Sequence, residues 1–341
     1  MPRTFDLRTG LNINPQGSAN MLSLSSPISS APLAGATLLT LAASIYFIRN
    51  ISQIGTPNRQ RRIKPAEERV LVIGASSGLG RAVAKQYAAR NARVCIVARR
   101  AEQLAQLAKE CGEKCFFVVA NFSDAGDMVR VREEILGKWH GLDTLCVCAG
   151  VSAVQPVMKL AGVDVGRDDD ASGAGIQHAV DIAARATQGN VYGPLVAALT
   201  FIPLLTRTST SPSILLVSSV AAVVPAPTRA LYAATKASSL LLFQSLAIEH
   251  PNITFTFILP ATIEGNFRAS AVDADPATRE AGLNQRGLKL DYVAQRCLDS
   301  VDRQVRGNVI IPWFPYSIAH HLYSLWPSLI EKQARKKYNF R

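Results

Sequence analysis

Residues 69–80 read Arg-Val-Leu-Val-Ile-Gly-Ala-Ser-Ser-Gly-Leu-Gly, and this stretch decides the fold of the 341-residue chain. The apolar run at its start predicts a short buried strand, and the residues that follow have the pattern of a helix. Glycines at a strand-to-helix turn let the backbone approach a pyrophosphate, while the helix N-terminus faces the anion. The spacing is G-x-x-x-G-x-G rather than the commoner G-x-G-x-x-G. The stretch therefore predicts a dinucleotide-binding turn.

The chain beyond this turn alternates short apolar runs with helical patterns. Such alternation predicts an α/β domain with a Rossmann-type, doubly wound, seven-stranded parallel sheet. Strands are expected near 69–74, 93–98, 115–120, 143–148, 213–218, 254–259 and 307–311, and helices near 78–90, 101–111, 123–138, 176–206, 232–249 and 291–304.

Three residues in the second half of the domain suit proton transfer to a carbonyl or alcohol oxygen. Tyr232 and Lys236 are four residues apart, so on a helix they project from the same face. A phenol is a poor acid-base group at neutral pH, and a nearby cation lowers its pKa by stabilising the phenolate. Ser219 follows an apolar run and can hold the substrate oxygen while charge develops on it.

Together, the glycine-rich turn, the serine and the Tyr-x-x-x-Lys pair resemble the short-chain dehydrogenase/reductase family over about 68–312. The resemblance implies a fourth catalytic residue, an asparagine three residues before a glycine. Asn190 and Gly193 fit that pattern. In the family this asparagine positions a water that links the lysine to a proton relay. Catalytic roles are therefore expected for Ser219, Tyr232, Lys236 and Asn190.

The expected cofactor is NADP(H). The second strand ends in Arg99 and Arg100, beside the place of the adenosine ribose, and an arginine there accommodates a 2′-phosphate. Arg99 is predicted to be the nearer of the two, with Ser76 or Ser77 as hydroxyl partners. The motifs and the resemblance imply cofactor contacts from Gly74, Ser76, Ser77, Gly78, Leu79, Gly80, Arg99, Arg100, Asn121, Phe122, Ala149, Gly150, Tyr232, Lys236, Pro260 and Ile263.

Four positions depart from the family pattern. Cys148 replaces the second asparagine of Asn-Asn-Ala-Gly, Asn121 replaces an aspartate, and Ala261 replaces a glycine. A threonine expected at the nicotinamide aligns with Gly265, although Thr262 is near enough to leave the register open. None of these changes removes a proton-transfer group. Because the changed positions are expected to contact the cofactor, the alternative to an enzyme is a catalytically silent, membrane-bound scaffold that keeps the fold.

The composition of the chain limits the classes of partner that it is expected to bind. The formal net charge is +12, which favours an anionic surface, and aromatic and basic residues are not interleaved as in nucleic-acid-binding proteins. The six cysteines have neither the spacing of a zinc site nor that of a disulfide framework, so no metal site is predicted and a reducing compartment is favoured.

The N-terminal region predicts a disordered tail over 1–30, a membrane anchor over 31–50 and a basic linker over 51–68. Residues 33–48 are apolar and uncharged and would extend about 25 Å as a helix, near the lower limit for spanning. An interfacial helix and a cleaved signal are the alternatives. Positive charge follows the apolar core, which predicts a catalytic domain on the cytosolic face of an intracellular membrane such as the endoplasmic reticulum.

The catalytic domain is predicted over 69–312, with a surface insertion at 162–175 that holds an acidic run. The extension 313–341 combines aromatic residues with a basic end, which suits a membrane interface or a contact in a homodimer. These features resemble the membrane-anchored 11β-hydroxysteroid dehydrogenase-like branch of the family. That resemblance implies a lipophilic ketone or alcohol as substrate, such as a steroid, sterol or other lipid.

Overall fold

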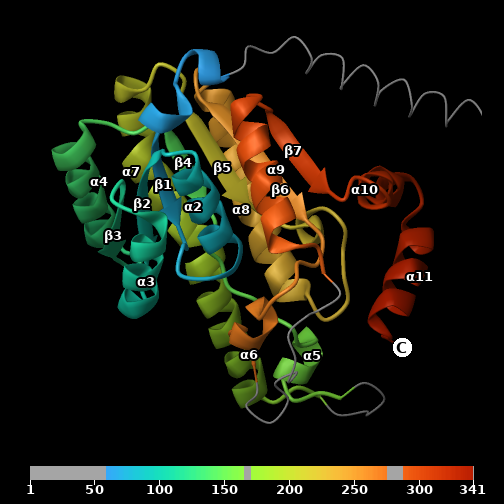
Figure 1. Ribbon diagram of the computed structural model, residues 1–341. Helices are drawn as coiled ribbons and strands as arrows, with labels where there is room; N and C mark the ends of the chain where they lie inside the picture. Colours follow the sequence, from blue (N-terminus) through green and yellow to red (C-terminus); the bar gives the residue numbers. More distant parts are fainter. Residues whose placement is uncertain (1–58, 165–169, 275–286, 341) are drawn as a thin grey trace, which may run out of the picture. The chain divides into compact units, whose positions relative to one another are not determined.

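The computed structural model describes residues 59–164, 170–274 and 287–340. The predicted tail, the membrane anchor, the first part of the linker and two aspartates of the insertion, Asp168 and Asp169, lie outside these ranges. One compact unit extends from Gly55 to the C-terminus. Figure 1 shows the described part of that unit as a coloured ribbon.

A parallel sheet of seven strands forms the centre of the unit, in the order β3-β2-β1-β4-β5-β6-β7. The order reverses between β1 and β4, so a crevice opens there at the carboxyl ends of the strands, where ligands bind in open α/β sheets. The predicted fold class is confirmed. The strands are β1 (Arg69–Ile73), β2 (Arg93–Ala98), β3 (Cys115–Val119), β4 (Thr144–Val147), β5 (Ser213–Val217), β6 (Thr254–Pro260) and β7 (Gly307–Ile311).

Helices cover both faces of the sheet, and each face has its own apolar core. The inner strands β1, β2, β4, β5 and β6 are mostly buried on both sides, which explains why they appear in the sequence as short, nearly continuous apolar runs. One core packs α2 (Gly78–Ala89), α3 (Ala101–Cys111) and α9 (Leu290–Asp302) on the sheet, and the other packs α4 (Ala125–Trp139), α7 (Gly193–Thr208) and α8 (Ala230–Glu249).

The helix expected over 176–206 differs from the prediction. It begins earlier, as α6 (Gly173–Thr187), and a π-turn, η3 (Gln188–Tyr192), interrupts it before α7. A short helix, α5 (Val157–Leu160), precedes it. Two described helices, Gly173–Thr208 and Ala230–Glu249, are long and apolar enough to cross a membrane. Both pack on the sheet, so their length and composition do not identify them as spans.

The extension after β7 forms two helices that the sequence pattern did not predict. α10 (Tyr316–Leu325) and α11 (Pro327–Tyr338) are joined at Trp326. Pro327 occupies the first turn of α11, where a proline is tolerated because its missing N–H would have no partner there. The proline therefore starts a helix rather than ending the ordered chain.

The end of the predicted linker is part of the core at the amino end of the sheet. Arg59, in the short turn η1 (Arg59–Arg61), is 1% exposed. Its guanidinium pairs with Glu68 and donates to Thr144 Oγ1 at 2.8 Å and to the Ser211 carbonyl at 2.9 Å. A second short turn, η2 (Pro65–Glu67), leads into β1. Because Arg59 is buried, it does not contribute to the basic surface expected beside the membrane.

Candidate active site

The turn after β1 brings three backbone segments into close contact. Gly74 has a φ of +88°, and a Cβ there would lie 2.5 Å from the Ala149 nitrogen. At Gly80, in the first turn of α2, a Cβ would lie 2.3 Å from the Gly74 carbonyl oxygen. Only glycine fits at either position. The start of α2 is thereby held against the β1 and β4 turns, an arrangement that suits a bound pyrophosphate.

A cleft of about 1940 Å³ extends across the carboxyl ends of the strands. All the residues predicted to bind the cofactor line this cleft. They come from the turns after β1, β2, β3, β4 and β6 and from α8. The narrow cradle formed by the glycines, together with the cleft that continues from it, fits a dinucleotide.

Ser219, Tyr232 and Lys236 meet in the middle of this cleft. Ser219 follows β5 at the start of the short turn η4 (Val220–Ala222), whereas Tyr232 and Lys236 lie in the first two turns of α8. The Ser219 hydroxyl hydrogen-bonds with the Tyr232 phenol. Lys236 is 4% exposed, and its Nζ donates to the Val217 carbonyl at 3.0 Å. The structure therefore brings together the three residues that the sequence pattern selected.

Burial dominates the ionisation of this group. It raises the pKa of Tyr232, while the hydrogen bond from Ser219 and the charge of Arg229 oppose that rise. Burial also lowers the pKa of Lys236 to about 8. The cations that lower the pKa of the phenol in this arrangement are Arg229 and Arg268, and neither was among the predicted site residues.

Asn190 lies in the π-turn and is fully buried. Its Oδ1 accepts a hydrogen bond from the Val151 N–H at 2.8 Å, and its Nδ2 donates to the Val151 carbonyl and to Thr235 Oγ1. The side chain thus clamps the loop after β4 against α8. A Cβ on Gly150 would lie 2.9 Å from Lys236 Nζ and 3.0 Å from Asn190 Oδ1, so all three groups are neighbours. Such π-turns are frequent at functional sites.

The two arginines after β2 differ in their contacts. Arg100 donates to Ser76 Oγ at 2.9 Å and to Ser77 Oγ at 2.6 Å. The sequence favours Arg99 as the arginine nearer a 2′-phosphate, which stays a prediction, whereas the arginine that contacts the two serines in the structure is Arg100. Both arginines are exposed in the cleft wall. The combination of Arg100 with two hydroxyls suits a phosphate group.

The positions that depart from the family pattern also lie at the cleft. Cys148 lies near Lys236, and burial raises the pKa of its thiol to about 12, so the thiol is neutral. Asn121 Oδ1 accepts a hydrogen bond from Ser123 Oγ at 3.0 Å. Thr262 and Gly265 both line the cleft, so both remain candidates for a nicotinamide contact.

Arg229 is a site residue that the motif analysis missed. It lies immediately before α8 and is 8% exposed. Its guanidinium carbon lies 5.2 Å from the centre of the Tyr232 ring, and its Nη1 donates to Ser152 Oγ at 3.0 Å and to the Ala153 carbonyl at 2.9 Å. No local pattern selects it, because its hydrogen-bond partners lie in the loop after β4, far away in the sequence.

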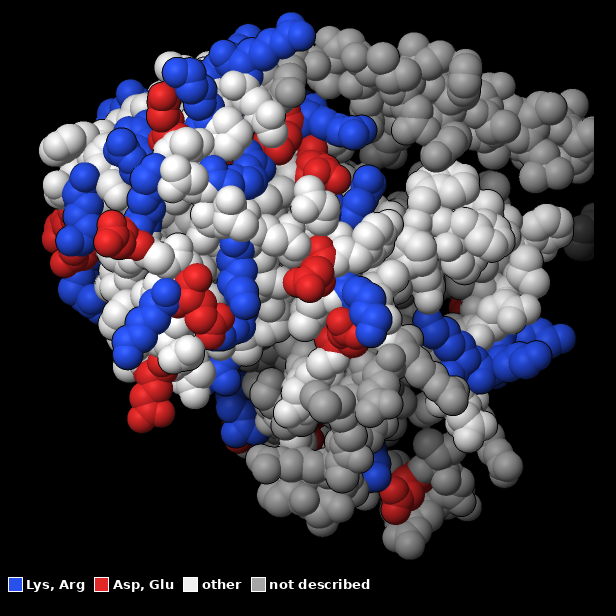
Figure 2. All heavy atoms as spheres, viewed as in Figure 1, with Lys and Arg blue, Asp and Glu red and all other residues white. Residues whose placement is uncertain are grey.

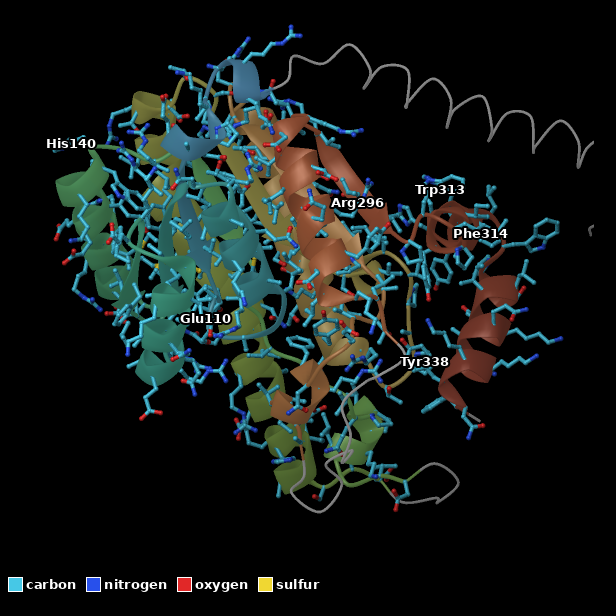
Figure 3. The ribbon with its side chains drawn as sticks, in the orientation of Figure 1. Glu110, His140, Arg296, Trp313, Phe314 and Tyr338 are labelled. Carbon is cyan, nitrogen blue, oxygen red and sulfur yellow. The ribbon has the colours of Figure 1, made fainter. Side chains whose placement is uncertain are left out.

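The C-terminal helices complete the outer wall of the cleft. Tyr316, Ile318 and Leu322 of α10 and Ile330 and Tyr338 of α11 are among its lining residues. Lys337 Nζ donates to Tyr316 Oη at 2.8 Å, which ties the two helices together. Figure 3 shows Tyr338 at the end of α11 and Phe314 on the outer side of this pair of helices.

The chain is similar in sequence to known dehydrogenases. The family model described as short chain dehydrogenase matches residues 68–276. The chain is similar to the dehydrogenase/reductase SDR family member 7B of Mus musculus, with 27% identity over 284 residues that cover 79% of this chain and 81% of that protein. It is also similar to the 11-beta-hydroxysteroid dehydrogenase-like 3 of Arabidopsis thaliana, with 30% identity over 203 residues, 58% and 60% of the two chains.

Among solved structures, the chain is similar to an alcohol dehydrogenase from the archaeon Thermococcus sibiricus complexed with 5-hydroxy-NADP. The TM-score is 0.57 and the identity 22%, and the match covers 71% of this chain and 95% of that one. This likeness confirms the fold.

Proposed function

The chain belongs to the short chain dehydrogenase family and is an oxidoreductase of alcohols and ketones, and we propose that it uses NADP(H) on a lipophilic secondary alcohol or ketone at a membrane. The observation that carries the proposal is the meeting of Ser219, Tyr232 and Lys236 in one cleft beside a glycine cradle. The similarity to 11-beta-hydroxysteroid dehydrogenase-like proteins supports a lipophilic substrate.

The chain's own residues would divide the work of proton transfer. Bound NADP(H) would supply or accept the hydride. In the reductive direction, the Tyr232 phenol gives its proton to the carbonyl oxygen, and Ser219 holds that oxygen by a hydrogen bond. Lys236 and Arg229 place positive charge beside the phenolate that forms. Asn190 keeps the loop after β4 and the lysine in register through its three hydrogen bonds.

The preference for the phosphorylated cofactor is assigned to Arg100, with Arg99 as a second cation. Its support is the pair of hydrogen bonds from Arg100 to Ser76 and Ser77 at the end of β2. An arginine with hydroxyl neighbours suits a 2′-phosphate, whereas the ribose of NAD(H) is usually met by a carboxylate. None of the pocket-lining residues at this end of the cleft is acidic.

Attachment to a membrane is proposed through the N-terminal segment and the C-terminal helices. The surface of α10 and α11 is apolar and basic, as Figure 2 shows for the cations at the end of the chain. Aromatic and aliphatic side chains beside lysines and arginines suit the interface of an anionic membrane. The exposed residues are Trp313, Phe314, Leu325, Trp326, Leu329, Lys332, Arg335, Lys336 and Lys337.

The proposed location is an intracellular membrane, the endoplasmic reticulum in particular, with the catalytic domain in the cytosol. Arg49, Arg61, Arg62 and Lys64 follow the apolar N-terminal segment and support this orientation. A homodimer is also proposed. Its support is the exposure of Leu199 on α7 and of Leu241 and Ile248 on α8, since apolar side chains of this size gather at contacts between subunits. Protease protection in sealed microsomes tests the orientation, and light scattering tests the dimer.

Purified full-length protein in detergent tests the proposed activity. NADPH oxidation is followed with a panel of lipophilic ketones, and cofactor binding is measured separately by NADPH fluorescence. Turnover of at least one ketone that disappears in Tyr232→Phe supports the proposal. NADPH binding without turnover on any member of the panel supports the alternative of a silent scaffold.

A further inference from the structure

The substrate half of the cleft contains several cations without acidic partners. Among the residues that the structure describes, none of these cations has a carboxylate oxygen within 4.0 Å. The carboxylate in the wall, Glu264, is paired with Lys289 at 2.8 Å. The cations concerned are Arg185, Arg229, Arg268 and Lys337.

Arg229 occupies an unfavourable position for a structural arginine. It precedes the first turn of α8, where the helix dipole disfavours a positive charge. Its neighbours at hydrogen-bond distance, Ser152 and Ala153, are neutral. The nearby carboxylate of Asp273 instead accepts hydrogen bonds from the backbone N–H groups of Val154 and Gln155. The guanidinium is therefore buried without a carboxylate at ion-pair distance among the described residues, and Asp273 compensates its charge only in part.

Arg268 adds a second positive charge at the same place. It lies in the short turn η5 (Phe267–Ser270) after β6, next to Phe267, whose ring is 6.1 Å from that of Tyr232. Its contact with Thr262 Oγ1, at 3.4 Å, is with a neutral group. Burial and the charge of Arg268 both lower the pKa of Arg229, which indicates mutual repulsion. Two like charges held together in a cleft are costly until an anion joins them.

We propose that the substrate carries an anionic group, a carboxylate or a phosphate, close to its reacting carbon, and that Arg229 and Arg268 bind it. This inference rests on the proposed oxidoreductase function and defines the class of its substrate. Arg229 lies 5.2 Å from the Tyr232 ring, and hydrogen bonds to the anion span about 3 Å. The anion is therefore separated from the carbonyl by a few bonds and is not at the far end of the lipid chain.

Matched pairs of substrates test the inference through turnover. One pair is a medium-chain ketone with a phosphate on the carbon next to the carbonyl and its dimethyl phosphate ester. The other is a medium-chain γ-keto carboxylate and its methyl ester. At least one free anion should have a kcat/KM about 10- to 100-fold above that of its ester, as expected for charge-assisted hydrogen bonds. The pair with the larger ratio distinguishes phosphate from carboxylate, and ratios near one for both overturn the inference.

Variants that remove or keep the charge of Arg268 test whether this residue binds the anionic group. Arg268→Gln should lower the ratio of anion to ester by about 10-fold, and Arg268→Lys should retain most of it. Arg207→Gln is the matched control, because this exposed arginine ends α7 at the opposite end of the sheet. Arg207→Gln should leave the ratio unchanged. An unchanged ratio in Arg268→Gln contradicts the assignment.

A binding measurement separates this inference from the proposed activity. Calorimetric titration of the Tyr232→Phe enzyme with NADPH present compares each free anion with its ester without turnover. Tighter binding of the anion that is lost on adding Arg268→Gln supports the subsite even if wild type turns over no ketone. Equal binding of anion and ester overturns the subsite even if neutral ketones are reduced.

Discussion

The amino end and the carboxyl end of the same parallel sheet both hold buried arginines, but the surroundings of these arginines differ. At the amino end, Arg59 pairs with Glu68, which also contacts Arg90, and Arg69 pairs with Asp143 at 2.8 Å. At the carboxyl end, Arg229 has only neutral hydrogen-bond partners among the described residues. Compensated charge belongs to the framework, whereas uncompensated charge is available to a ligand.

The difference predicts two kinds of variant. A change at the amino end should lower the free energy of unfolding and leave the activity of the folded enzyme intact. A change at the carboxyl end should lower activity or binding without a large loss of stability, because functional sites carry groups that do not stabilise the fold. Variants at the two ends of the sheet therefore test this division.

Tyr232→Phe should lower kcat by about 10²- to 10⁴-fold, since it removes the proton-transfer group and little volume. The free energy of unfolding should fall by no more than about 1.5 kcal/mol, because the change removes one hydroxyl and its hydrogen bond with Ser219. Steady-state kinetics and urea denaturation measure the two quantities. Retention of a tenth of the wild-type activity would show that the tyrosine assignment is wrong.

Arg59→Met should lower the free energy of unfolding by about 3–5 kcal/mol, because it leaves the carboxylate of Glu68 buried without its partner. Arg61→Met is the matched control, since Arg61 belongs to the same turn but is exposed. The kcat of the folded Arg59→Met protein should equal that of wild type. A loss of kcat without a loss of stability would contradict the division between the two ends.

Lys236→Met tests the cost of the buried ammonium through pH. The folded-state pKa of Lys236 is about 8, below the ordinary value of 10.5. Below pH 8 both folded and unfolded states bind the proton, so the cost of burial is present in full. Between the two pKa values the folded state has released it, and stability rises with pH. The cofactor-free wild type should therefore gain about 3 kcal/mol relative to Lys236→Met across this window. A pH-independent difference between the two urea denaturation curves contradicts the shift.

The sequence predicts the framework of this fold well because the signals are local. Each strand is an apolar run bounded by turn residues, and Tyr232 and Lys236 are fixed by their spacing on one helix. The π-turn is different. It is held by two hydrogen bonds between the Asn190 side chain and the backbone of Val151, 39 positions earlier in the chain. No helical period in the local sequence contains that information.

For the same reason, the sequence pattern does not identify the roles of two arginines whose partners lie far along the chain. In the sequence, Arg59 resembles one of the solvated charges of the linker. In the structure, Glu68, Thr144 and Ser211 surround its side chain. Arg229 has no motif of its own, and its role follows from the loop after β4 that it contacts. Tertiary contacts thus decide which arginines are framework and which face a ligand.

Arg100→Gln should lower the preference for NADPH over NADH by about 10-fold, the smallest of these effects. Arg100 precedes α3, and its guanidinium lies on Ser76 and Ser77, whereas Arg99 lacks this contact. Loss of hydrogen bonds to a charged phosphate costs about 1.5–3 kcal/mol, part of which the serines and Arg99 would retain. Arg99→Gln is the matched control and should change the preference less, as measured by kcat/KM for each cofactor. A larger loss of NADPH preference in Arg99→Gln than in Arg100→Gln would identify Arg99 as the residue that binds the 2′-phosphate. An unchanged preference in both variants would mean that this exposed pair of arginines is not the phosphate site. Both variants should unfold like wild type, which would place these arginines with the ligand-facing charges at the carboxyl end of the sheet.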